Sequence, residues 1–513
     1  IAPARSFDTV ENALTGGVFF SFGKYGLEIT EQLVLSSGVD PSLNAPPAPH
    51  DEAVEYATAP YNVENLYDFR DDPFDGCDFA GNAGCPGVTP PFNYVPASEA
   101  DYQAQLAALA EQIIDDLHAP EILLIQEAED QDICAVVSGV LDCDDGVDDR
   151  DGRPDTLQEL ALAIAAAGGP TYDAAYDRDG ADDRGIVSGF LYRTDRVELL
   201  GPDAGHAVLG DSPQVDYAAP GLAYNADVQN PKALNAELPA EVEVGDGCDE
   251  PVDCVFTRDP QVGLFRIWRD AIGASAFTDV YAISNHFSSG PDRRVEQRTE
   301  QAAYNAAIVA ALTEAHPDAR IVVGGDFNVY PEPDDPFSPN ESNQLASLYG
   351  LGLHSLWEDV LAVAPSSAYS YIFEGQAQTL DNQFVNDALY AELNAVRFAH
   401  VNADWPAAHD GDGSRGASDH DPQVARFDAV SADALANLVE YLLASGEIDE
   451  SKAAQLLSRL ERVGTHVDAG ETAAAHAQLR AFVNQVDGLA PRWMGPDVAE
   501  LLRIEAEVLA STL

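Results

Sequence analysis

The apolar run over residues 321–328 constrains the fold more than any other segment of the chain. It reads Ile-Val-Val-Gly-Gly-Asp-Phe-Asn, so aliphatic residues are followed by two glycines and then by Asp326 and Asn328. An apolar run of this length that is bounded by glycine is typical of a buried strand. Open α/β folds place their chemistry at the carboxyl ends of such strands. Residues two apart on an extended chain point the same way, so Asp326 and Asn328 are expected to face a common spot.

Five other segments repeat this pattern of an apolar run that leads to a polar side chain. A single polar strand end does not by itself indicate a functional site, because a Gly-Asp-x-Asn turn is often only a hairpin and a single histidine is often a buried structural residue. Six such ends in one chain favour a shared site. The polar groups at the five further ends are Asn62 with Glu64, Glu127, His286, Asp381, and Asp419 with His420.

The residue types at these ends indicate a particular chemistry. Carboxylates together with an amide, and without cysteine, suit a hard divalent cation such as Mg²⁺ or Mn²⁺. Two imidazoles beside such a cation suit the hydrolysis of a phosphate ester. One imidazole would position or deprotonate water, and the other would stabilise the non-bridging oxygens.

Strands and helices are expected to alternate from about residue 57 to residue 428, which is typical of an α/β domain. A strand pair is expected from Gly185–Tyr192 and Val197–Leu200. Further expected strands are Ala59–Leu66, Glu121–Gln126, Val262–Trp268, Phe277–Ser284, Tyr369–Phe373 and Leu380–Val385. Expected helices are Tyr102–Leu117, Thr156–Ala167 and Arg293–His316.

The chain divides into three predicted parts. Residues 1–56 form a β-rich stub and a linker, residues 57–428 form the catalytic domain, and residues 429–513 form a helical module. The module is expected to dock a surface or a partner, or to be a helical spacer. Its expected helices are Asp433–Ser445, Glu450–Val463, Glu471–Val486 and Pro496–Leu513.

The charge of the chain is extreme. Its 513 residues carry 88 acidic and 26 basic side chains, for a net charge of −62. Such a surface indicates life in high salt, where screening limits self-repulsion, or an acidic secreted protein from a GC-rich genome. The charge also opposes the binding of a polyanion.

The six cysteines fall into three close pairs, Cys77/Cys85, Cys134/Cys143 and Cys248/Cys254. Local disulfides in an oxidising compartment explain these pairs better than a zinc site, because Cys-x-x-Cys spacing is absent. The chain begins at Ile1, from which we expect that a leader was removed. No apolar stretch reaches the roughly 18–20 residues of a membrane span. A secreted, extracellular or cell-surface protein is therefore expected.

The order of the polar motifs resembles that of the endonuclease/exonuclease/phosphatase superfamily, to which pancreatic deoxyribonuclease belongs. The resemblance covers roughly residues 57–428. Residues 62–68 are similar to those of large secreted bacterial nucleases in that superfamily, and Leu479–Val486 resembles a helical module of extracellular bacterial enzymes. The matching motifs are Asn62-x-Glu64, Gln126-Glu127, Asn285-His286, Gly325-Asp326-Phe327-Asn328, Leu380-Asp381 and Ser418-Asp419-His420.

The resemblance implies a fold and a metal site. The fold would be a four-layered α/β sandwich, in which two packed mixed sheets are flanked by helices. Glu127 would be the main ligand of Mg²⁺ or Mn²⁺, with Glu64 and Asp419 nearby. Glu64 replaces the aspartate of some relatives, which leaves its contact with the cation open.

The resemblance also implies catalytic roles. Asp326 would orient or deprotonate the attacking water. His420 would act as general base or acid, oriented by Asp381, while His286 would donate to the transition-state oxygens. The remaining role is substrate binding. Asn62 would hydrogen-bond the phosphate or a ligand carboxylate, and Asn328 would hold the phosphate.

Other candidates have simpler explanations. Arg298, with Arg293 and Arg294, could grip a phosphate backbone or form ion pairs with Glu296 and Glu300. Two acidic segments, Asp142–Asp151 and Asp177–Asp183, could hold structural Ca²⁺ or be solvated loops. Arg258 and Arg184 are further basic residues that could reach the site.

Three functions follow from these residues. The leading one is a secreted nuclease that hydrolyses DNA or RNA with a divalent metal. The second function uses the same site and acts on a phosphomonoester or a phospholipid headgroup. A membrane-binding enzyme would be expected to carry an exposed aromatic hairpin, and no clear one is evident in the sequence. The third is a surface or matrix protein in which the nuclease-like domain is only a scaffold.

Overall fold

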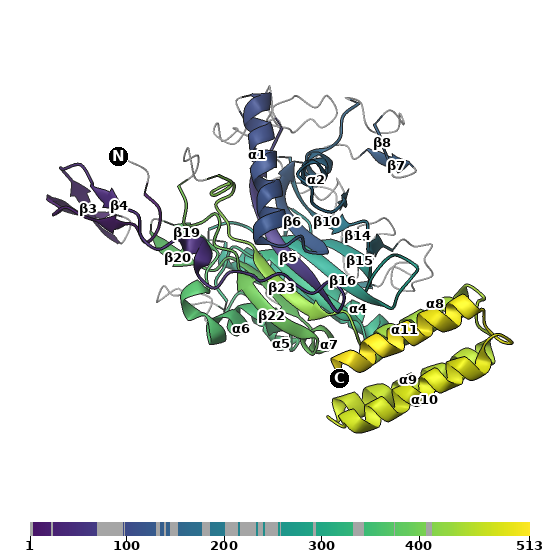
Figure 1. Ribbon diagram of the computed structural model, residues 1–513. Coiled ribbons are helices and arrows are strands. Elements are labelled where there is room, and N and C mark those ends of the chain that lie inside the picture. Colours follow the sequence, from purple (N-terminus) through teal and green to yellow (C-terminus); the bar gives the residue numbers. More distant parts are fainter. Residues whose placement is uncertain are drawn as a thin grey trace.

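The computed structural model describes most of the chain (Figure 1). The described residues are 4–21, 24–68, 96, 98–129, 134–137, 140–143, 152–176, 185–200, 214–215, 232–233, 240–241, 255–256, 258–290, 294–331, 343–373, 375–406 and 413–513. The cysteine pairs Cys77/Cys85 and Cys248/Cys254 and the segment Asp177–Asp183 lie outside these residues.

Two mixed sheets form the centre of the molecule. The first has the strand order β22-β23-β5-β6-β10-β9, and the second has the order β11-β15-β16-β17-β21-β18, with β14 also paired to β15. The first sheet consists of β5 (Glu55–Leu66), β6 (Ile122–Glu129), β9 (Tyr172–Ala175), β10 (Ile186–Arg193), β22 (Leu393–Phe398) and β23 (Gln423–Asp428). The second consists of β11 (Val197–Leu199), β14 (Ala240–Glu241), β15 (Gln261–Trp268), β16 (Phe277–His286), β17 (Arg320–Asp326), β18 (His354–Ser355) and β21 (Asp381–Val385).

Helices cover the outer faces of both sheets and complete four layers (Figure 1). Helices α1 (Glu99–Glu111) and α2 (Thr156–Ala166) pack on the first sheet, and α4 (Val295–Ala315) and α5 (Ala346–Gly350) pack on the second. A third core, which includes Leu124 and Phe265, fills the space between the sheets. The predicted four-layered α/β sandwich is therefore confirmed.

Strand alternation explains which side chains face the space between the sheets. In β5, Tyr56 packs in the core between the sheets, whereas Ala57 and Ala59 pack against α1 and α2. Thr58, two residues after Tyr56, donates across the gap to Gln383 Oε1 at 2.6 Å. Because side chains alternate along a strand, Asn62 falls on the same inner side. The inner face of each strand thus leads to the polar residue at its end.

One strand pairing expected from the sequence is wrong. β10 pairs with β6 and β9, whereas β11 pairs with β15 in the other sheet. The short turn at residues 194–196 passes from one sheet to the other instead of closing a hairpin. Two flanking strands, β9 and β22, also lie outside the segments expected from the sequence.

Smaller elements connect the main ones. The hairpin of β7 and β8 is closed by a disulfide between Cys134 and Cys143, which confirms that predicted pair. The bounds of the small elements are η1 (Pro41–Leu43), η2 (Gln112–Asp116), β7 (Ala135–Val137), β8 (Val140–Asp142), β12 (Gln214–Val215), β13 (Lys232–Ala233), α6 (Leu356–Val363), η5 (Pro365–Ser367), β19 (Tyr371–Phe373), β20 (Gln376–Gln378) and α7 (Asp387–Tyr390).

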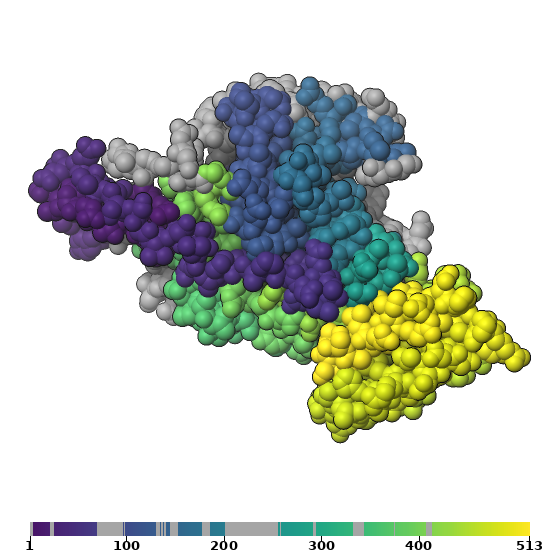
Figure 2. Space-filling model, viewed as in Figure 1, coloured from purple at the N-terminus to yellow at the C-terminus, as the bar shows by residue number. Residues whose placement is uncertain are grey.

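The amino-terminal segment projects from the sandwich as a hairpin (Figure 2). Strands β2 (Gly16–Ser21) and β3 (Lys24–Ile29) form it, and β1 (Thr9–Val10) pairs with β4 (Leu35–Ser36) at its base. One face carries Val18, Phe20, Tyr25 and Leu27, which are 73%, 61%, 81% and 44% exposed. The expectation that the chain lacks an exposed aromatic hairpin is therefore wrong, because these residues find no core to pack against within the described chain.

The carboxyl-terminal module contains the four expected helices, α8 (Ala432–Ala444), α9 (Glu450–Asp468), α10 (Thr472–Leu489) and α11 (Pro496–Thr512). They share one hydrophobic core. The module docks on the second sheet, where Asn437 Nδ2 donates to Phe277 O at 3.2 Å and Arg269 forms two bonds with Glu505, at 2.6 and 2.8 Å. Among the described residues, no helix is long and apolar enough to cross a membrane.

Candidate metal-dependent hydrolytic site

The register of the second sheet brings three predicted site residues together. His286 lies opposite Asp326 in the parallel pair of β16 and β17, and Asp326 lies opposite Asp381 in the antiparallel pair of β17 and β21. In the first sheet, the parallel pairing of β5 and β6 places Asn62 opposite Gln126, so that Glu127 is the next residue. All these side chains gather where the two sheets meet at one end.

Gly325 allows the strands to approach at this point. It has φ +144°, and a Cβ added there would lie 1.9 Å from Asn285 O. Only glycine fits such a backbone without strain. The second glycine of the Gly-Gly pair therefore sets the register that places Asp326 beside His286.

The strand ends are bent where the site forms. Glu64, Asn65, Glu127 and Asn328 all have positive φ angles, between 49° and 66°. Left-handed backbone is uncommon for these residue types and collects at functional sites. The expectation that Asp326 and Asn328 point together off an extended chain is therefore corrected: the chain turns at Asn328, and the turn brings its side chain back to Asp326.

Hydrogen bonds hold the carboxylates in place. Asn62 Nδ2 donates to Glu127 Oε1 at 3.1 Å and to Asp326 Oδ2 at 3.2 Å, so that one amide joins the two sheets. The backbone N–H of Asn65 donates to Glu127 Oε2 at 3.0 Å. Asn328 holds the other side of Asp326, with its N–H donating at 2.8 Å and its Nδ2 at 2.9 Å.

The two histidines lie on different sides of Asp326. His286 Nε2 lies 3.5 Å from both Glu127 Oε1 and Asp326 Oδ2. His420 Nδ1 lies 2.7 Å from Asp381 Oδ2, whereas its Nε2 faces Asp326 Oδ2 at 3.9 Å and Asp419 Oδ1 at 3.7 Å. Asp381 is therefore placed to orient His420, as the sequence predicted. The Nε2 atom of His420 then faces the centre of the site.

The site holds more negative charge than its histidines balance. Burial, followed by the charges of Asp419 and Glu127, raises the pKa of Glu64 to about 8. Burial also raises the pKa of Asp326 to about 7; His420 opposes this shift and Asp381 adds to it. Burial disfavours the charged form of His420, but the carboxylates of Asp381, Asp419 and Asp326 outweigh it and raise the pKa of that imidazole well above its usual value.

This donor set fits a divalent cation. Ligand atoms of Glu127, His286 and Asp326 lie within 4.8 Å of one another. Burial is the main cause of the raised pKa values of Glu64, Asp326 and Asp419, and neighbouring carboxylates add to each shift. A bound cation would favour the charged forms of these groups. Oxygen donors of this kind suit Mg²⁺ or Mn²⁺. Of the three ligands predicted from the sequence, this cluster contains Glu127 but not Glu64 or Asp419.

The structure adds supporting contacts from Ser418, which belongs to the predicted Ser418-Asp419-His420 motif, and from two residues that were missed from the sequence. Ser370 Oγ accepts the backbone N–H of Asp381 at 3.0 Å, and Ser418 Oγ donates to Asn62 O at 2.7 Å. The ring of Tyr371 packs on His420, with the centroids 4.7 Å apart. Ser418 directly precedes the Asp-His pair, so its position was a usable signal, whereas Ser370 and Tyr371 reach the site only through the fold.

The structure does not bring Arg298 to the site. Its guanidinium is fully buried and donates to Ser288 O and Gln344 Oε1, both at 2.7 Å. A guanidinium enclosed in this way ties α4 to the preceding loop, so the predicted contact with substrate is corrected. Arg258 is also buried and donates to Phe287 O at 3.0 Å, directly after His286. Arg184 and Arg293, and most of Asp142–Asp151, lie outside the described residues.

Two other groups of titratable side chains are structural. Asp421 accepts the backbone N–H groups of residues 401–403 and bonds His400 Nδ1 at 2.9 Å. Glu121 accepts from Ala57 N at 2.7 Å and contacts Arg193 and Arg196 at 3.3 and 3.2 Å. The carboxylates of Asp421 and Glu121 are thus already occupied by protein donors.

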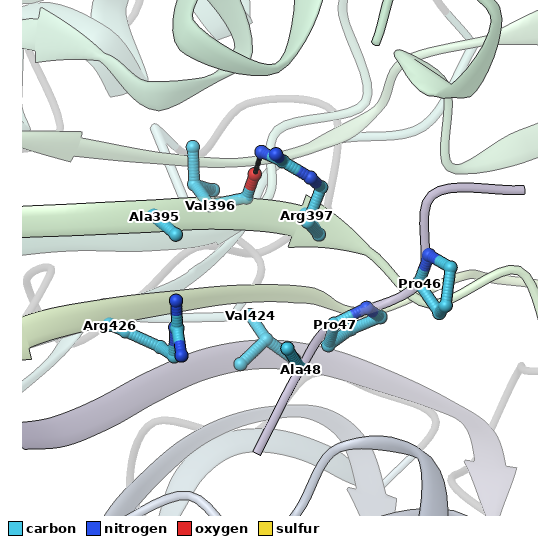
Figure 3. A pocket seen from close by; sticks show the side chains of 8 residues that line it. All are labelled: Pro46, Pro47, Ala48, Ala395, Val396, Arg397, Val424 and Arg426. Carbon is cyan, nitrogen blue, oxygen red and sulfur yellow. Dashed lines mark hydrogen bonds between the residues drawn. The ribbon is translucent and has the colours of Figure 1, made fainter. Parts of the chain in front are cut away.

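A pocket of about 140 Å³ lies elsewhere, between β22, β23 and the linker before β5 (Figure 3). Its lining contains two arginines and otherwise apolar side chains, and it lacks the carboxylates that the candidate site provides. The lining residues are Pro46, Pro47, Ala48, Ala395, Val396, Arg397, Val424 and Arg426. Arg397 turns back to donate to Val396 O at 2.6 Å.

The chain was compared with known protein families, curated proteins and solved structures. The model of the FIMAH domain family matches residues 432–511. No curated protein matches the sequence. Three of the solved structures that match are the following. An endonuclease/exonuclease/phosphatase from Bacteroides vulgatus is 16% identical, with 73% of this chain and 99% of that chain covered and a TM-score of 0.38. D. rerio TDP2, humanized by 14 mutations, is 13% identical, with 73% and 98% covered and a TM-score of 0.36. The catalytic domain of human Nocturnin with bound sulfate is 13% identical, with 73% and 95% covered and a TM-score of 0.35.

Proposed function

We propose that the chain is a divalent-metal-dependent phosphodiesterase of the endonuclease/exonuclease/phosphatase type, and that it hydrolyses DNA or RNA. One observation carries the proposal: the polar ends of five strands, and the Asp419–His420 pair before β23, converge on Asp326. Turns without a shared function would not place two histidines and five carboxylates at one end of two sheets.

In this proposal, each residue has a distinct role in the reaction. A cation held by Glu127, with Glu64 and Asp419, would stabilise the phosphate oxygens as negative charge builds on them. Asp326 accepts a proton from water as the water oxygen bonds to phosphorus. The bond from phosphorus to the leaving oxygen breaks, and His420 Nε2 gives that oxygen a proton.

The remaining residues position these groups. Asp381 holds His420 through Nδ1, and Asn62 and Asn328 hold the Asp326 carboxylate through their amides. His286 Nε2 lies beside both Glu127 and Asp326, where it can donate to a non-bridging oxygen. A phosphate bound beside Asp326 would therefore have the proton acceptor Asp326 and the two proton donors His286 and His420 within reach.

The test is hydrolysis of plasmid DNA and of a long RNA with Mg²⁺ or Mn²⁺, with and without EDTA. We expect cleavage that needs the metal and that is lost in His420→Ala. A matched control is His466→Ala, a histidine of the helical module that pairs with Glu471 at 2.7 Å. Intact DNA and RNA under every condition would refute the nuclease function.

We also propose that the protein is exported and adapted to salt. The Cys134–Cys143 disulfide supports an oxidising compartment. The net charge of −62 repels a polyanionic substrate, and salt weakens this repulsion. Cleavage by this protein should persist or rise with added NaCl, whereas a basic nuclease loses affinity as salt rises.

A second candidate function is favoured by the amino-terminal hairpin. Its apolar face, which includes Phe20 and Tyr25 with centroids 4.9 Å apart, is of the kind that enters a membrane interface. The same catalytic site would then hydrolyse a phospholipid headgroup. Release of phosphocholine from vesicles, lost in a Phe20→Ser and Tyr25→Ser double variant, would identify this function. Unchanged release in the double variant would show that the hairpin has no part in this function.

A further inference from the structure

The outer surface of the carboxyl-terminal module carries a row of amide and cationic side chains between α9 and α10. We call this row the amide–cation seam. Its members are Lys452, Gln455 and Arg459 on α9, Gln478 and Gln485 on α10, and Trp493 directly after α10.

Hydrogen bonds and cation–π contacts join the members of the seam into one surface. Arg459 Nε donates to Gln485 Oε1 at 2.9 Å, and Arg459 Nη1 donates to Gln478 Oε1 at 3.4 Å. Gln485 Nε2 donates to Gln455 Oε1 at 3.4 Å. At one end, Lys452 Nζ and the guanidinium carbon of Arg492 each lie 5.0 Å from the ring centroid of Trp493, which is 43% exposed. All six side chains reach solvent at least in part.

The charge of the seam is opposite to that of the chain. The protein has 88 acidic and 26 basic residues, yet two of the six seam residues are cations, none is acidic, and Arg492 adds a third cation. Two acidic residues border the seam: Asp449, the N-cap of α9, lies near Lys452, and Glu471 is paired with His466. A cationic surface of this kind on a protein of charge −62 is complementary to an anionic partner.

The spacing of the cations indicates a polymer. Lys452 and Arg459 are seven residues apart on one helix, which corresponds to roughly 10 Å along its axis. One small anion cannot touch both. The indole and the amides further indicate sugar rings, because an amide offers both a donor and an acceptor to hydroxyl groups, whereas a phosphate backbone offers acceptors alone. Gln478 Nε2 has no protein acceptor within the described part of the chain.

The position of the seam leaves it free for such a partner. The module touches the second sheet through α8 and α11, where Tyr441 packs on Trp268 with centroids 5.3 Å apart and Glu505 pairs with Arg269. Helices α9 and α10 form the outer layer, away from the sandwich (Figure 1). The docked end of β16 begins at Phe277, whereas His286, at its other end, belongs to the catalytic site.

We propose that the amide–cation seam binds an acidic polysaccharide, one whose sugar rings carry carboxylate or sulfate groups. Carboxylate or sulfate groups contact Lys452, Arg459 and Arg492, and sugar hydroxyls bond the glutamine amides. The seam would hold the enzyme on an acidic polymer while leaving the hydrolytic site open. This inference is independent of which phosphoester the site hydrolyses.

The test is direct binding of the full chain to immobilised polygalacturonate, in EDTA so that hydrolysis plays no part. NaCl at about 0.5 M shortens the reach of the overall repulsion. The variant is Lys452→Gln with Arg459→Gln. The matched control is Arg462→Gln, an exposed arginine of the same helix that donates to Ser458 O at 2.9 Å. A Trp493→Ala variant tests the aromatic end separately.

We expect the double variant and Trp493→Ala to bind polygalacturonate at least tenfold more weakly, with Arg462→Gln and the thermal unfolding temperature unchanged. Neutral dextran should not bind. Failure of the wild-type chain to bind, or equal binding by the double variant and Arg462→Gln, would overturn the proposal. Tighter, seam-dependent binding of a single-stranded oligonucleotide would overturn it too, and would assign the seam to nucleic acid.

Discussion

Gly325 offers the sharpest test of how the strand register builds the site. The change Gly325→Ala adds a Cβ that would lie 1.9 Å from Asn285 O, about 1 Å inside the 3.0 Å that such contacts respect. It also puts a side chain on a residue with φ +144°. Gly325 and Asn285 are register partners, and the next pair is His286 with Asp326. The strand ends that carry these two catalytic groups must therefore move apart.

The expected cost has two parts. A side chain at a backbone conformation of this kind costs about 1–3 kcal/mol. Separation of β16 and β17 at this point weakens about two ladder hydrogen bonds, each worth about 1 kcal/mol. Unfolding free energy should therefore fall by about 3–5 kcal/mol. Displacement of catalytic groups by about 1 Å costs on the order of 100-fold in rate, so kcat should fall at least that far.

Gly324→Ala is the matched control. Its Cβ would lie 3.1 Å from Leu124 Cδ2 and 3.3 Å from Gln383 Cγ, which are side-chain atoms that can shift slightly. We expect a change of at most about 1 kcal/mol and a small effect on kcat. The assays are denaturant unfolding and metal-dependent hydrolysis of bis(p-nitrophenyl) phosphate. If Gly325→Ala were as stable and as active as Gly324→Ala, the argument from register would be wrong.

Three further predictions concern single side chains. Asp381→Asn removes the charge that holds His420 Nδ1 at 2.7 Å, so kcat should fall about 100-fold with little change in KM; equal kcat values would exclude the pair from catalysis. Burial raises the pKa of Asp155 to about 7, so the native carboxyl stays protonated while the unfolded one ionises near pH 4. This contribution to stability is complete below about pH 4 and is lost as the pH rises to about 7, a fall of about 4 kcal/mol that Asp155→Asn should remove from the pH profile of unfolding. Replacing Cys134 and Cys143 by serine opens a short loop, with a sequence separation of 9, and should cost about 2–3 kcal/mol in denaturant unfolding; no change would show that the loop stays ordered without the bond.

Much of the sandwich was predictable because its buried strands appear in the sequence as short apolar runs. The run at residues 321–326 and the run at 122–126 are apolar on both faces, as expected of strands buried between a helix layer and a second sheet. The predicted site residues Glu127, His286 and Asp326 meet because each follows such a strand at the same end. The apolar runs, and the positions of the polar residues that follow them, therefore predicted where the site lies.

The errors come from places where local pattern does not determine the partner. β10 and β11 are separated by three residues, a spacing that suits a hairpin, yet each finds a longer apolar strand in a different sheet. Arg298 follows other basic residues at the start of a helix, but the fold turns its guanidinium inward to Ser288. In each case a tertiary contact outweighs the local signal.

The location of the cations bears on how an acidic protein would act on the acidic substrate proposed for it. Arg193, Arg269 and Arg320 each bind carboxylates within the fold, at distances of 2.5 to 2.6 Å. The partners of Arg269 and Arg320, Glu505 and Glu392, are largely buried, whereas Glu52 and Asp195 beside Arg193 are about half exposed. Each of these arginines has its charge balanced by a neighbouring carboxylate and contributes little to the field that a substrate meets. At the site, positive charge comes from His420, whose pKa is raised, and from the cation that the carboxylates are suited to hold. Attraction of a phosphodiester is thus concentrated within a few ångströms of Asp326, where screening by salt acts weakly, while the repulsion from the surface acts at long range and is screened strongly. Added salt should therefore lower KM until the short-range contacts themselves weaken.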